Sequence, residues 1–283
     1  MQKPFTHILP LLLSLLILGS SAAIYAQTAF IRGTVKSASG QEPLPFVNIG
    51  IKKKGIGTAS DVEGNFKLRL EDTFRQDTLT FSAIGFQDLS VPIRDMAANN
   101  THQFLLTEKA QVLQEVLVLG KAPKIRKLGV RYKMPFLFGS AETKSTDDVS
   151  ELAQLINIHG KSAELLSTTV YLKSTKADSA TFRVNFYRQQ DGKLAQRLVE
   201  KSIIQRLPLD KGWVTVDLQP YGILVDDDFY IGFEYLPDSR QTEKFLFFYG
   251  AVLGGHIFAR NVSLGEWRST AGGQLSAYVT VRQ

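Results

Sequence analysis

Apolar and polar residues alternate with a period of two in short runs along most of this 283-residue chain. In Phe46–Ile51, the residues Val47, Ile49 and Ile51 share one face, and in Phe66–Leu70 apolar residues alternate with cations. Because successive side chains of a β-strand point to opposite faces of a sheet, both runs predict half-buried strands. Turns rich in Gly, Asp and Asn separate the runs, which is typical of an antiparallel sandwich.

One of these turns, Asp61–Asn65, has a specific backbone requirement. Its tight reversal needs a residue at positive φ, and Gly64 is the residue without a Cβ that would clash there. The sequence therefore predicts that any larger side chain at Gly64 introduces backbone strain.

The second half of the chain continues the two-residue pattern. Phe182, Val184 and Phe186 share one face of such a run. A short helix is expected over about Thr146–Ile156, and seven strands are predicted at Ser167–Lys173, Thr181–Arg188, Ser202–Arg206, Trp213–Leu218, Phe229–Leu236, Lys244–Tyr249 and Gln274–Arg282. Seven or eight strands of this length predict a two-sheet jelly roll. The expected fold class is all-β, with two tandem β-sandwiches at residues 27–120 and 151–283.

The first sandwich resembles a known family. The residues that carry the resemblance are Gly33, Val35, Pro43–Pro45, Val47–Ile49, Gly57, Thr58, Asp61, Gly64, Phe66, Phe81, Ser82 and Ile84–Phe86. Over about residues 28–107 they resemble the carboxypeptidase-like regulatory domain of Bacteroidota envelope proteins, a prealbumin-like Greek-key sandwich found at the N-terminus of SusC-like TonB-dependent receptors. The resemblance implies a structural or docking module. It does not imply a peptidase.

The segment Leu113–Gly120 is similar to the one that follows this domain in SusC-like receptors. Two interpretations stay open. The segment is either the last or edge strand of the first domain, or a strand that pairs with the sheet edge of another protein.

The first 26 residues have the layout of a secretory signal peptide. A cation at Lys3 precedes the apolar run Ile8–Gly19, and small residues follow at Ser20–Ala23. The apolar run is short for a membrane span of about 20 residues, although an uncleaved anchor is the alternative. The protein is therefore expected to be exported, either to the periplasm, to the outer membrane or to the medium.

The net charge of +6 is concentrated in one segment. Residues 27–120 hold ten cations and ten anions, residues 151–283 hold fifteen and fourteen, and residues 121–150 hold seven and three. We therefore predict a basic interdomain linker at 121–150, with the cations Lys121, Lys124, Arg126, Lys127, Arg131 and Lys133. It is either a solvated spacer or a contact for an anionic membrane surface. No base-stacking or groove-reading motif accompanies the charge, so nucleic acid is not an expected partner.

Catalytic and metal motifs are not found in the sequence. There is no cysteine, which excludes disulfides and thiolate metal sites. His102, His159 and His256 lack a carboxylate three residues further on, and no H-E-x-x-H is present. The acidic run Asp226–Asp228 suits a turn between strands better than a calcium site. We therefore expect no catalytic residue, no metal and no cofactor.

The aromatic side chains of the second half are the candidate ligand contacts. Trp267 lies in a polar, glycine-flanked stretch, and Tyr249 and Trp213 are weaker candidates; core packing is the alternative for all three. The sequence thus predicts a non-enzymatic, exported binding or scaffolding protein of the cell envelope, with an envelope protein or a glycan as partner. The alternatives are a carbohydrate-binding accessory of an outer-membrane glycan-uptake system and a hydrolase with an unrecognised site. The hydrolase would need two carboxylates in a cleft.

Overall fold

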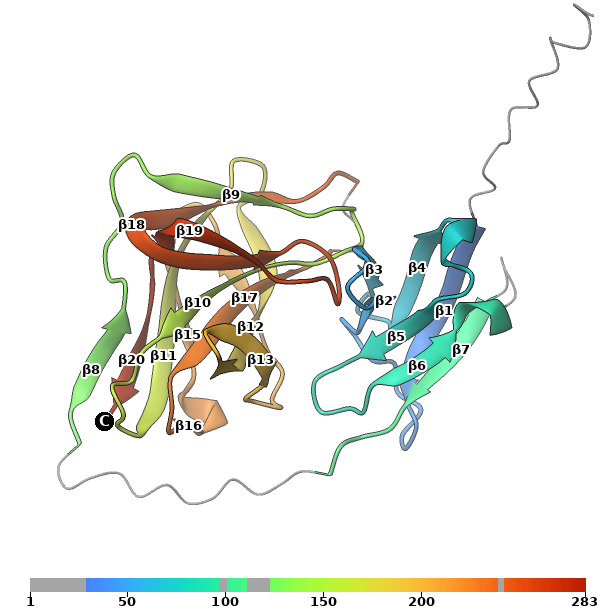
Figure 1. The fold of residues 1–283 in the computed structure, drawn as a ribbon, viewed down its shortest axis with the longest axis horizontal. Helices are drawn as coiled ribbons and strands as arrows, with labels where there is room; N and C mark the ends of the chain where they lie inside the picture. The colour runs from blue at the N-terminus through green and yellow to red at the C-terminus, as the bar shows by residue number, and fades with distance from the viewer. Residues whose placement is uncertain (1–28, 97–100, 111–122, 239–241) are drawn as a thin grey trace, which may run out of the picture.

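The computed structural model describes residues 29–96, 101–110, 123–238 and 242–283. These residues fold into a smaller N-terminal sandwich and a larger C-terminal sandwich (Figure 1), and the prediction of an all-β chain with two sandwiches is confirmed. The predicted signal peptide at 1–26 and the segment Leu113–Gly120 lie outside the described residues. No helix in the described part is long and apolar enough to cross a membrane.

The N-terminal sandwich consists of two small sheets that face one another. Its elements are β1 (Ala29–Ser37), β2 (Asn48–Ile51), β3 (Ile56–Ala59), β4 (Asn65–Leu70), the 3-10 helix η1 (Asp72–Phe74), β5 (Thr78–Ser82), β6 (Leu89–Pro92), the 3-10 helix η2 (Ile93–Asp95) and β7 (Thr101–Leu106). One sheet has the order β4-β1-β7, with β1 parallel to β7, and the other has the order β3-β2-β5-β6.

The core of this sandwich follows from the alternation in its strands. Along β4, every second residue is buried, and these residues face the opposite sheet. Phe66, Phe81 and Phe104 meet at its centre, with ring centroids 4.2 to 5.7 Å apart. Aromatic contacts at this distance add to the free energy gained by burying the rings.

The C-terminal sandwich contains the remaining strands. They are β8 (Ile125–Gly129), β9 (Phe138–Glu142), β10 (Ser150–Ile156), β11 (Ala163–Lys173), β12 (Ser179–Gln190), β13 (Lys193–Arg197), β14 (Ile203–Pro208), β15 (Gly212–Asp217), the 3-10 helix η3 (Gln219–Tyr221), β16 (Ile223–Val225), β17 (Phe229–Leu236), β18 (Leu246–Arg260), β19 (Arg268–Leu275) and β20 (Ala277–Arg282). The predicted strand Phe229–Leu236 is reproduced with the same bounds, and Lys244–Tyr249 is only the beginning of a longer strand.

Strand β18 joins the two layers of this sandwich. Its residues up to Gly250 pair with β9 and β11, and its residues from Ala251 pair with β19 and then β10. A large apolar core fills the space between the layers. The path β13-β12-β17-β10-β18 forms the layer that faces the N-terminal sandwich.

The prediction of a helix over Thr146–Ile156 is wrong. Ser150–Ile156 forms strand β10, which lies between β17 and β18 and is buried almost throughout. Its Glu, Leu, Ala and Gln favour helices in isolation, but pairing on both edges and burial on both faces outweigh that local preference.

The segment predicted as a linker at 121–150 contains two strands of the C-terminal sandwich. Strand β8 pairs with β20, and strand β9 pairs with β18. The residues of β8 do not alternate between apolar and polar, because this edge strand is rich in cations. Lysine and arginine on an edge strand discourage pairing with other chains. The cations of this segment that the structure describes therefore lie on the surface of a folded sandwich.

Candidate functional site

A cavity of about 630 Å³ opens on the outer side of the layer β13-β12-β17-β10-β18. It is lined by β10, by the turn between β12 and β13, by β17, β18 and β19, and by Trp267 from the loop that precedes β19. This is the volume of a site for a small organic molecule or a short oligosaccharide.

Three aromatic rings form the apolar walls of the cavity. Tyr230 and Phe258 meet edge to face at 5.0 Å, and the Tyr230 hydroxyl donates to the carbonyl of Gly192 at 2.8 Å. Trp267 is half-buried and packs edge to face on Tyr187 at 5.6 Å. The guanidinium of Arg260 lies 4.8 Å from the centroid of the Trp267 ring, so the indole is fixed by a cation–π contact as well.

Polar groups complete the lining of the cavity. Amide side chains come from Gln154, Asn157 and Gln274, and the ring of His256 contacts the Ser269 hydroxyl at 3.2 Å. Gln154 donates to the carbonyl of Ala277 at 3.3 Å, while its Oε1 is buried and has no hydrogen bond in the described part of the chain. The cavity thus combines flat rings with amide and hydroxyl groups and with two charged residues, Asp191 and Lys193.

A row of four charged residues crosses the layer next to Trp267. Arg183 on β12, Glu234 on β17, Glu151 on β10 and Arg260 on β18 occupy paired positions on adjacent strands. Glu151 and Glu234 are directly opposite one another, an arrangement that is destabilising for like charges by themselves. The two arginines at the ends of the row balance the two carboxylates.

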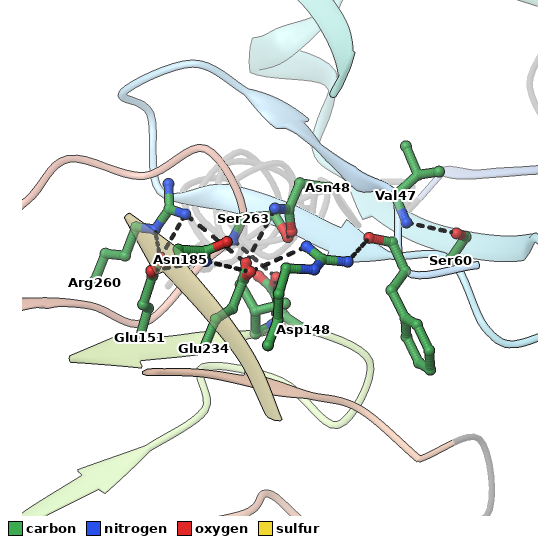
Figure 2. A network of polar contacts seen from close by, with 12 residues as sticks. Val47, Asn48, Ser60, Asp148, Glu151, Asn185, Glu234, Arg260 and Ser263 are labelled. Carbon is green, nitrogen blue, oxygen red and sulfur yellow. Dashed lines mark hydrogen bonds and ion pairs between the residues drawn. The ribbon is translucent and has the colours of Figure 1, made fainter. Parts of the chain in front are cut away.

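Each carboxylate of this row is held by several donors (Figure 2). Glu151 accepts from the Arg260 guanidinium at 2.8 Å, and from Asn185 and the Tyr187 hydroxyl at 2.9 and 2.8 Å. Gly232 provides the space, since a Cβ there would lie 2.3 Å from Glu151 Oε1. Burial raises the pKa of Glu151; Arg260 opposes this rise and Glu234 adds to it.

Glu234 is the centre of the network. Its Oε2 accepts from Arg183 at 3.0 Å and from Asn185 at 2.9 Å. Burial by itself would raise the pKa of Glu234, but the charges of Arg183, Arg260 and Arg197 outweigh it and hold the pKa at about 2. Glu234 is therefore an anion at any physiological pH.

The network continues into the N-terminal sandwich. The Asn48 amide of β2 donates to Glu234 Oε1 at 3.0 Å, and its oxygen accepts from the Ser263 hydroxyl at 3.0 Å (Figure 2). Arg183 also donates to the carbonyl of Phe46 at 2.7 Å. All three contacts cross from one sandwich to the other. The residues that fix Trp267 thus belong to the same polar network as the domain interface.

A second carboxylate, Asp148, supports the interface from behind. Its Oδ1 accepts the backbone N–H groups of Val149 and Ser263, both at 2.8 Å. Burial raises the pKa of Asp148 to about 7, although its hydrogen bonds with Ser263 and Val149 act in the opposite direction. The loop that carries Ser263 ends at Trp267, so one loop serves both the interface and the cavity.

The structure separates the three predicted ligand residues. Trp267 lines the cavity, whereas Tyr249 lies against Gly139 of β9 and Trp213 packs on Tyr171 of β11. Lys124, Arg126, Lys127, Arg131 and Lys133 lie on or beside β8, and Lys121 is outside the described residues. Trp213 and the basic residues therefore belong to another face of the sandwich than Trp267.

The sequence did not reveal the charged row. Arg183, Asn185 and Tyr187 alternate with the core residues of β12, so the pattern places them on the solvent side. In the structure this side is covered by the N-terminal sandwich and the loop before β19. The opposite charges of Arg183 on β12 and Glu234 on β17 could have indicated this row. To recognise them as a pair, however, one must know the register of the two strands.

The acidic residues of the described part do not form a metal site. No group of three or more histidine, aspartate or glutamate side chains with metal-binding spacing occurs there. The acidic run Asp226–Asp228 lies between β16 and β17 as a turn, and Asp228 accepts the backbone N–H of Ile158 at 2.8 Å. Asp191 is the carboxylate that lines the cavity.

Comparisons with known proteins concern mainly the N-terminal sandwich. The TonB-dependent receptor SusC of Bacteroides thetaiotaomicron is 32% identical over 96 residues, which are 34% of this chain and 9% of the receptor. The TonB-dependent receptor P3 of Formosa agariphila is 31% identical over 110 residues, which are 39% of this chain and 10% of the receptor. The chain thus corresponds to a small part of the length of these relatives.

Among solved structures, the cysteine protease Cwp84 of Clostridium difficile after propeptide cleavage is similar to this chain. The similarity extends over 88% of this chain and 61% of the protease chain. The sequence identity is 8% and the TM-score is 0.40, which is too low to assign a fold or a function. The family comparison is more specific, because it covers the strands of the N-terminal sandwich. Residues 31–118 of this chain match the CarboxypepD_reg-like domain.

Proposed function

We propose that this protein is a non-enzymatic, exported binding protein of the cell envelope, and that its C-terminal sandwich holds a glycan in the Trp267 cavity. The observation that carries the proposal is the composition of the cavity. Tyr230, Phe258 and Trp267 offer flat apolar surfaces, and amides and a hydroxyl line the same cavity. Sugars present apolar C–H faces and hydroxyl groups, which match this lining.

The arrangement of the carboxylates favours binding over hydrolysis. Glycoside hydrolysis uses two carboxyl groups on either side of the scissile bond. Glu151 and Glu234 are completely buried and paired with arginines, and neither lines the cavity. Asp191 is then the one carboxylate that faces a ligand among the described lining residues. The similarity of residues 31–118 to a regulatory domain supports the same conclusion.

The envelope location is supported by the relatives and by the predicted leader. Both relatives are TonB-dependent receptors, and the N-terminal residues resemble a secretory signal peptide. The N-terminal sandwich serves as a docking module in this proposal. Because the polar network joins it to the cavity wall, a docked N-terminal sandwich fixes the position of the ligand site.

The test measures binding of a defined panel of oligosaccharides by isothermal titration calorimetry. The probes are malto-, cello-, xylo- and manno-hexaose. We expect at least one to bind, and Trp267→Ala to weaken it by about 1–3 kcal/mol, the contribution of one stacked ring. Trp267→Phe, which keeps an aromatic ring, should retain most of the affinity.

Trp213→Ala is the matched control, because Trp213 is the second of the two tryptophans and does not line the cavity. It should leave oligosaccharide binding unchanged. Equal loss in both variants, or no binding of any probe at millimolar concentration, would contradict the glycan proposal. Release of shorter sugars during the titration would show that the protein hydrolyses the oligosaccharide, and would contradict a non-enzymatic role.

A further inference from the structure

A second aromatic surface lies on the other layer of the C-terminal sandwich. It consists of four aromatic rings in a row, Phe138 on β9, Tyr171 on β11, Trp213 on β15 and Tyr278 on β20. The distances between the centroids of successive rings are 5.9, 5.5 and 6.2 Å. We call these four rings, together with the residues 123–138 beside them, the aromatic face. It contains no residue of the Trp267 cavity.

Exposed apolar side chains are concentrated on this face. Eight large apolar side chains are exposed in the described part of the chain, and five of them belong here: Ile125, Tyr132, Phe136, Phe138 and Trp213. Single exposed apolar residues are normal, but a contiguous group marks an interaction surface.

Phe136 is the most prominent member of the group. Its side chain is 98% exposed at the tip of the turn Met134–Leu137. Both ends of the turn are fixed to one residue of β18, since Met134 donates to the carbonyl of Ala251 and Ala251 donates to that of Leu137, at 3.2 and 3.3 Å. The turn that carries this exposed ring is therefore fixed by backbone hydrogen bonds.

Cations surround the exposed rings. Residues 123–140 contain Lys124, Arg126, Lys127, Arg131 and Lys133, and no acid. The Lys133 ammonium lies 4.7 Å from the Phe138 centroid, and that of Lys127 lies 5.1 Å from Tyr278. These cation–π contacts hold positive charge at the same level as the rings.

The acidic residues of the neighbouring strands do not cancel this charge. Glu164 is paired with Arg282 at 2.6 Å. Asp217 on β15 and Glu142 on β9 are exposed, but each lies four residues from the ring on its own strand, Trp213 or Phe138, or roughly 13 Å along the strand. The face therefore presents rings and a net positive charge together.

From these observations we propose that the aromatic face docks on the surface of an anionic lipid bilayer. At such a surface, exposed rings enter the boundary between headgroups and acyl chains, and cations remain at the level of the lipid phosphates. Strand β8 lies on the side of the C-terminal sandwich away from the N-terminal sandwich (Figure 1). Docking through this face leaves the N-terminal sandwich free to contact a protein.

The test uses Trp213 as a local reporter. In the purified Trp267→Phe protein, Trp213 is the single tryptophan and is 36% exposed. Vesicles of phosphatidylglycerol and phosphatidylcholine should shift its emission to shorter wavelength, and lipids brominated near the headgroup should quench it. Vesicles of phosphatidylcholine alone should have a much smaller effect, and 0.5 M salt should reverse the shift because it screens the charges.

Two variants in this background separate rings from charge. Phe136→Ser should reduce vesicle binding at least tenfold, and Lys124→Gln with Arg131→Gln should reduce it about fivefold for each cation removed. Val62→Ser, and Lys53→Gln with Arg75→Gln, are the matched controls, since these exposed residues lie on the N-terminal sandwich. All variants carry the same N-terminus, so a leader contributes equally to each.

An unchanged Trp213 emission with anionic vesicles overturns the proposal. The same holds if the control variants lose as much binding as the variants of the aromatic face. A Trp213 shift produced by the hexasaccharide panel and not by vesicles would make this face a glycan platform instead. Loss of oligosaccharide binding in Trp267→Ala leaves this test unaffected, so the two proposals fail independently.

Discussion

Asn48 of the N-terminal sandwich donates its side-chain amide to Glu234 of the C-terminal sandwich at 3.0 Å, across 186 residues of sequence. Both side chains are completely buried. Glu234 is also the carboxylate that Arg183 and Asn185 neutralise and solvate. The contact between the two sandwiches is therefore part of the electrostatic balance inside the larger one.

This relationship makes the interface more than a surface contact. A buried carboxylate is tolerated only when charges and hydrogen bonds replace its water shell. Asn48 supplies one of these hydrogen bonds, and Ala59, Val149 and Leu236 form a small apolar cluster beside it. Removing the N-terminal sandwich would expose Glu234 and Arg183 and change the support of the Trp267 loop.

The first prediction follows from this contact. Asn48→Ala removes the donor to Glu234 and the acceptor of Ser263, and it should lower the free energy of unfolding by about 1–3 kcal/mol. Asn48→Asp should be more destabilising at pH 7, because it places a second carboxylate beside Glu234. Chemical unfolding, followed by tryptophan fluorescence and by circular dichroism, measures both.

Thr34→Ala is the control for this prediction. It removes an exposed hydrogen bond to Asn65 at 2.8 Å within the N-terminal sandwich, and we expect a loss within about 0.5 kcal/mol for such a surface change. Equal stability of Asn48→Ala and the native protein would mean that the two sandwiches are not coupled through Glu234 in solution.

The alternation in the sequence predicted nine of the twenty strands that the structure describes. Where one face of a strand is buried and the other is exposed to solvent, as in β4, the apolar residues of the sequence are the buried residues of the structure. The alternation failed at β10, which is buried on both faces and reads like a helix, and at β8, a charged edge strand. In both cases the deciding interactions are with strands far away in the sequence.

The candidate site was predictable only in part. Trp267 was recognised because a tryptophan in a polar, glycine-flanked loop is unusual, and it does line the cavity. Tyr249 and Trp213 were grouped with it by composition alone, and the structure places them elsewhere. The row of Arg183, Glu234, Glu151 and Arg260 depends on register and on a second domain. The periodicity of apolar residues along the chain reveals neither the register nor the contact with the second domain.

The second prediction concerns Gly64, whose expected positive φ is confirmed at 77°. A Cβ at this position would also lie 2.7 Å from the carbonyl oxygen of Val35. Gly64→Ala should therefore cost the left-handed backbone strain and an additional clash, together on the order of 2–4 kcal/mol. Thermal unfolding measures the loss.

Gly160 separates the two contributions. It has a similar φ of 66°, but a Cβ there would meet nothing within 4 Å. Gly160→Ala should cost only the backbone term, about 1–2 kcal/mol. Equal losses at the two glycines would show that Val35 and its strand move away at little cost, and that the turn is less rigid than the structure indicates.

The last prediction concerns the dependence of stability on pH. The pKa of Asp148 rises from 3.8 to about 7 on folding because the carboxyl group is buried, so the folded protein binds this proton more tightly than the unfolded chain. Its contribution to stability is complete below pH 4 and is lost as the pH rises through 7. At about 1.4 kcal/mol per pKa unit, the loss is on the order of 4 kcal/mol.

Glu234 acts in the opposite direction and in another pH window. Its pKa falls from 4.5 to about 2 on folding, so its contribution is present above pH 4.5 and is lost as the pH falls toward 2. The two groups together predict a maximum of stability near pH 4 to 5. Between pH 5 and pH 8 stability should fall with pH because of Asp148, with an addition of the same sign from Glu151.

Asp148→Asn isolates the Asp148 contribution. The amide oxygen can still accept the N–H groups of Val149 and Ser263, but the side chain no longer titrates. The free energy of unfolding, measured with urea from pH 4 to pH 8, should decline markedly less in this variant than in the native protein. Asp147→Asn, at the exposed neighbouring position, is the matched control and should follow the native profile. Parallel profiles for the native protein and Asp148→Asn would show that Asp148 keeps its ordinary proton affinity, and hence that water reaches it behind the interface.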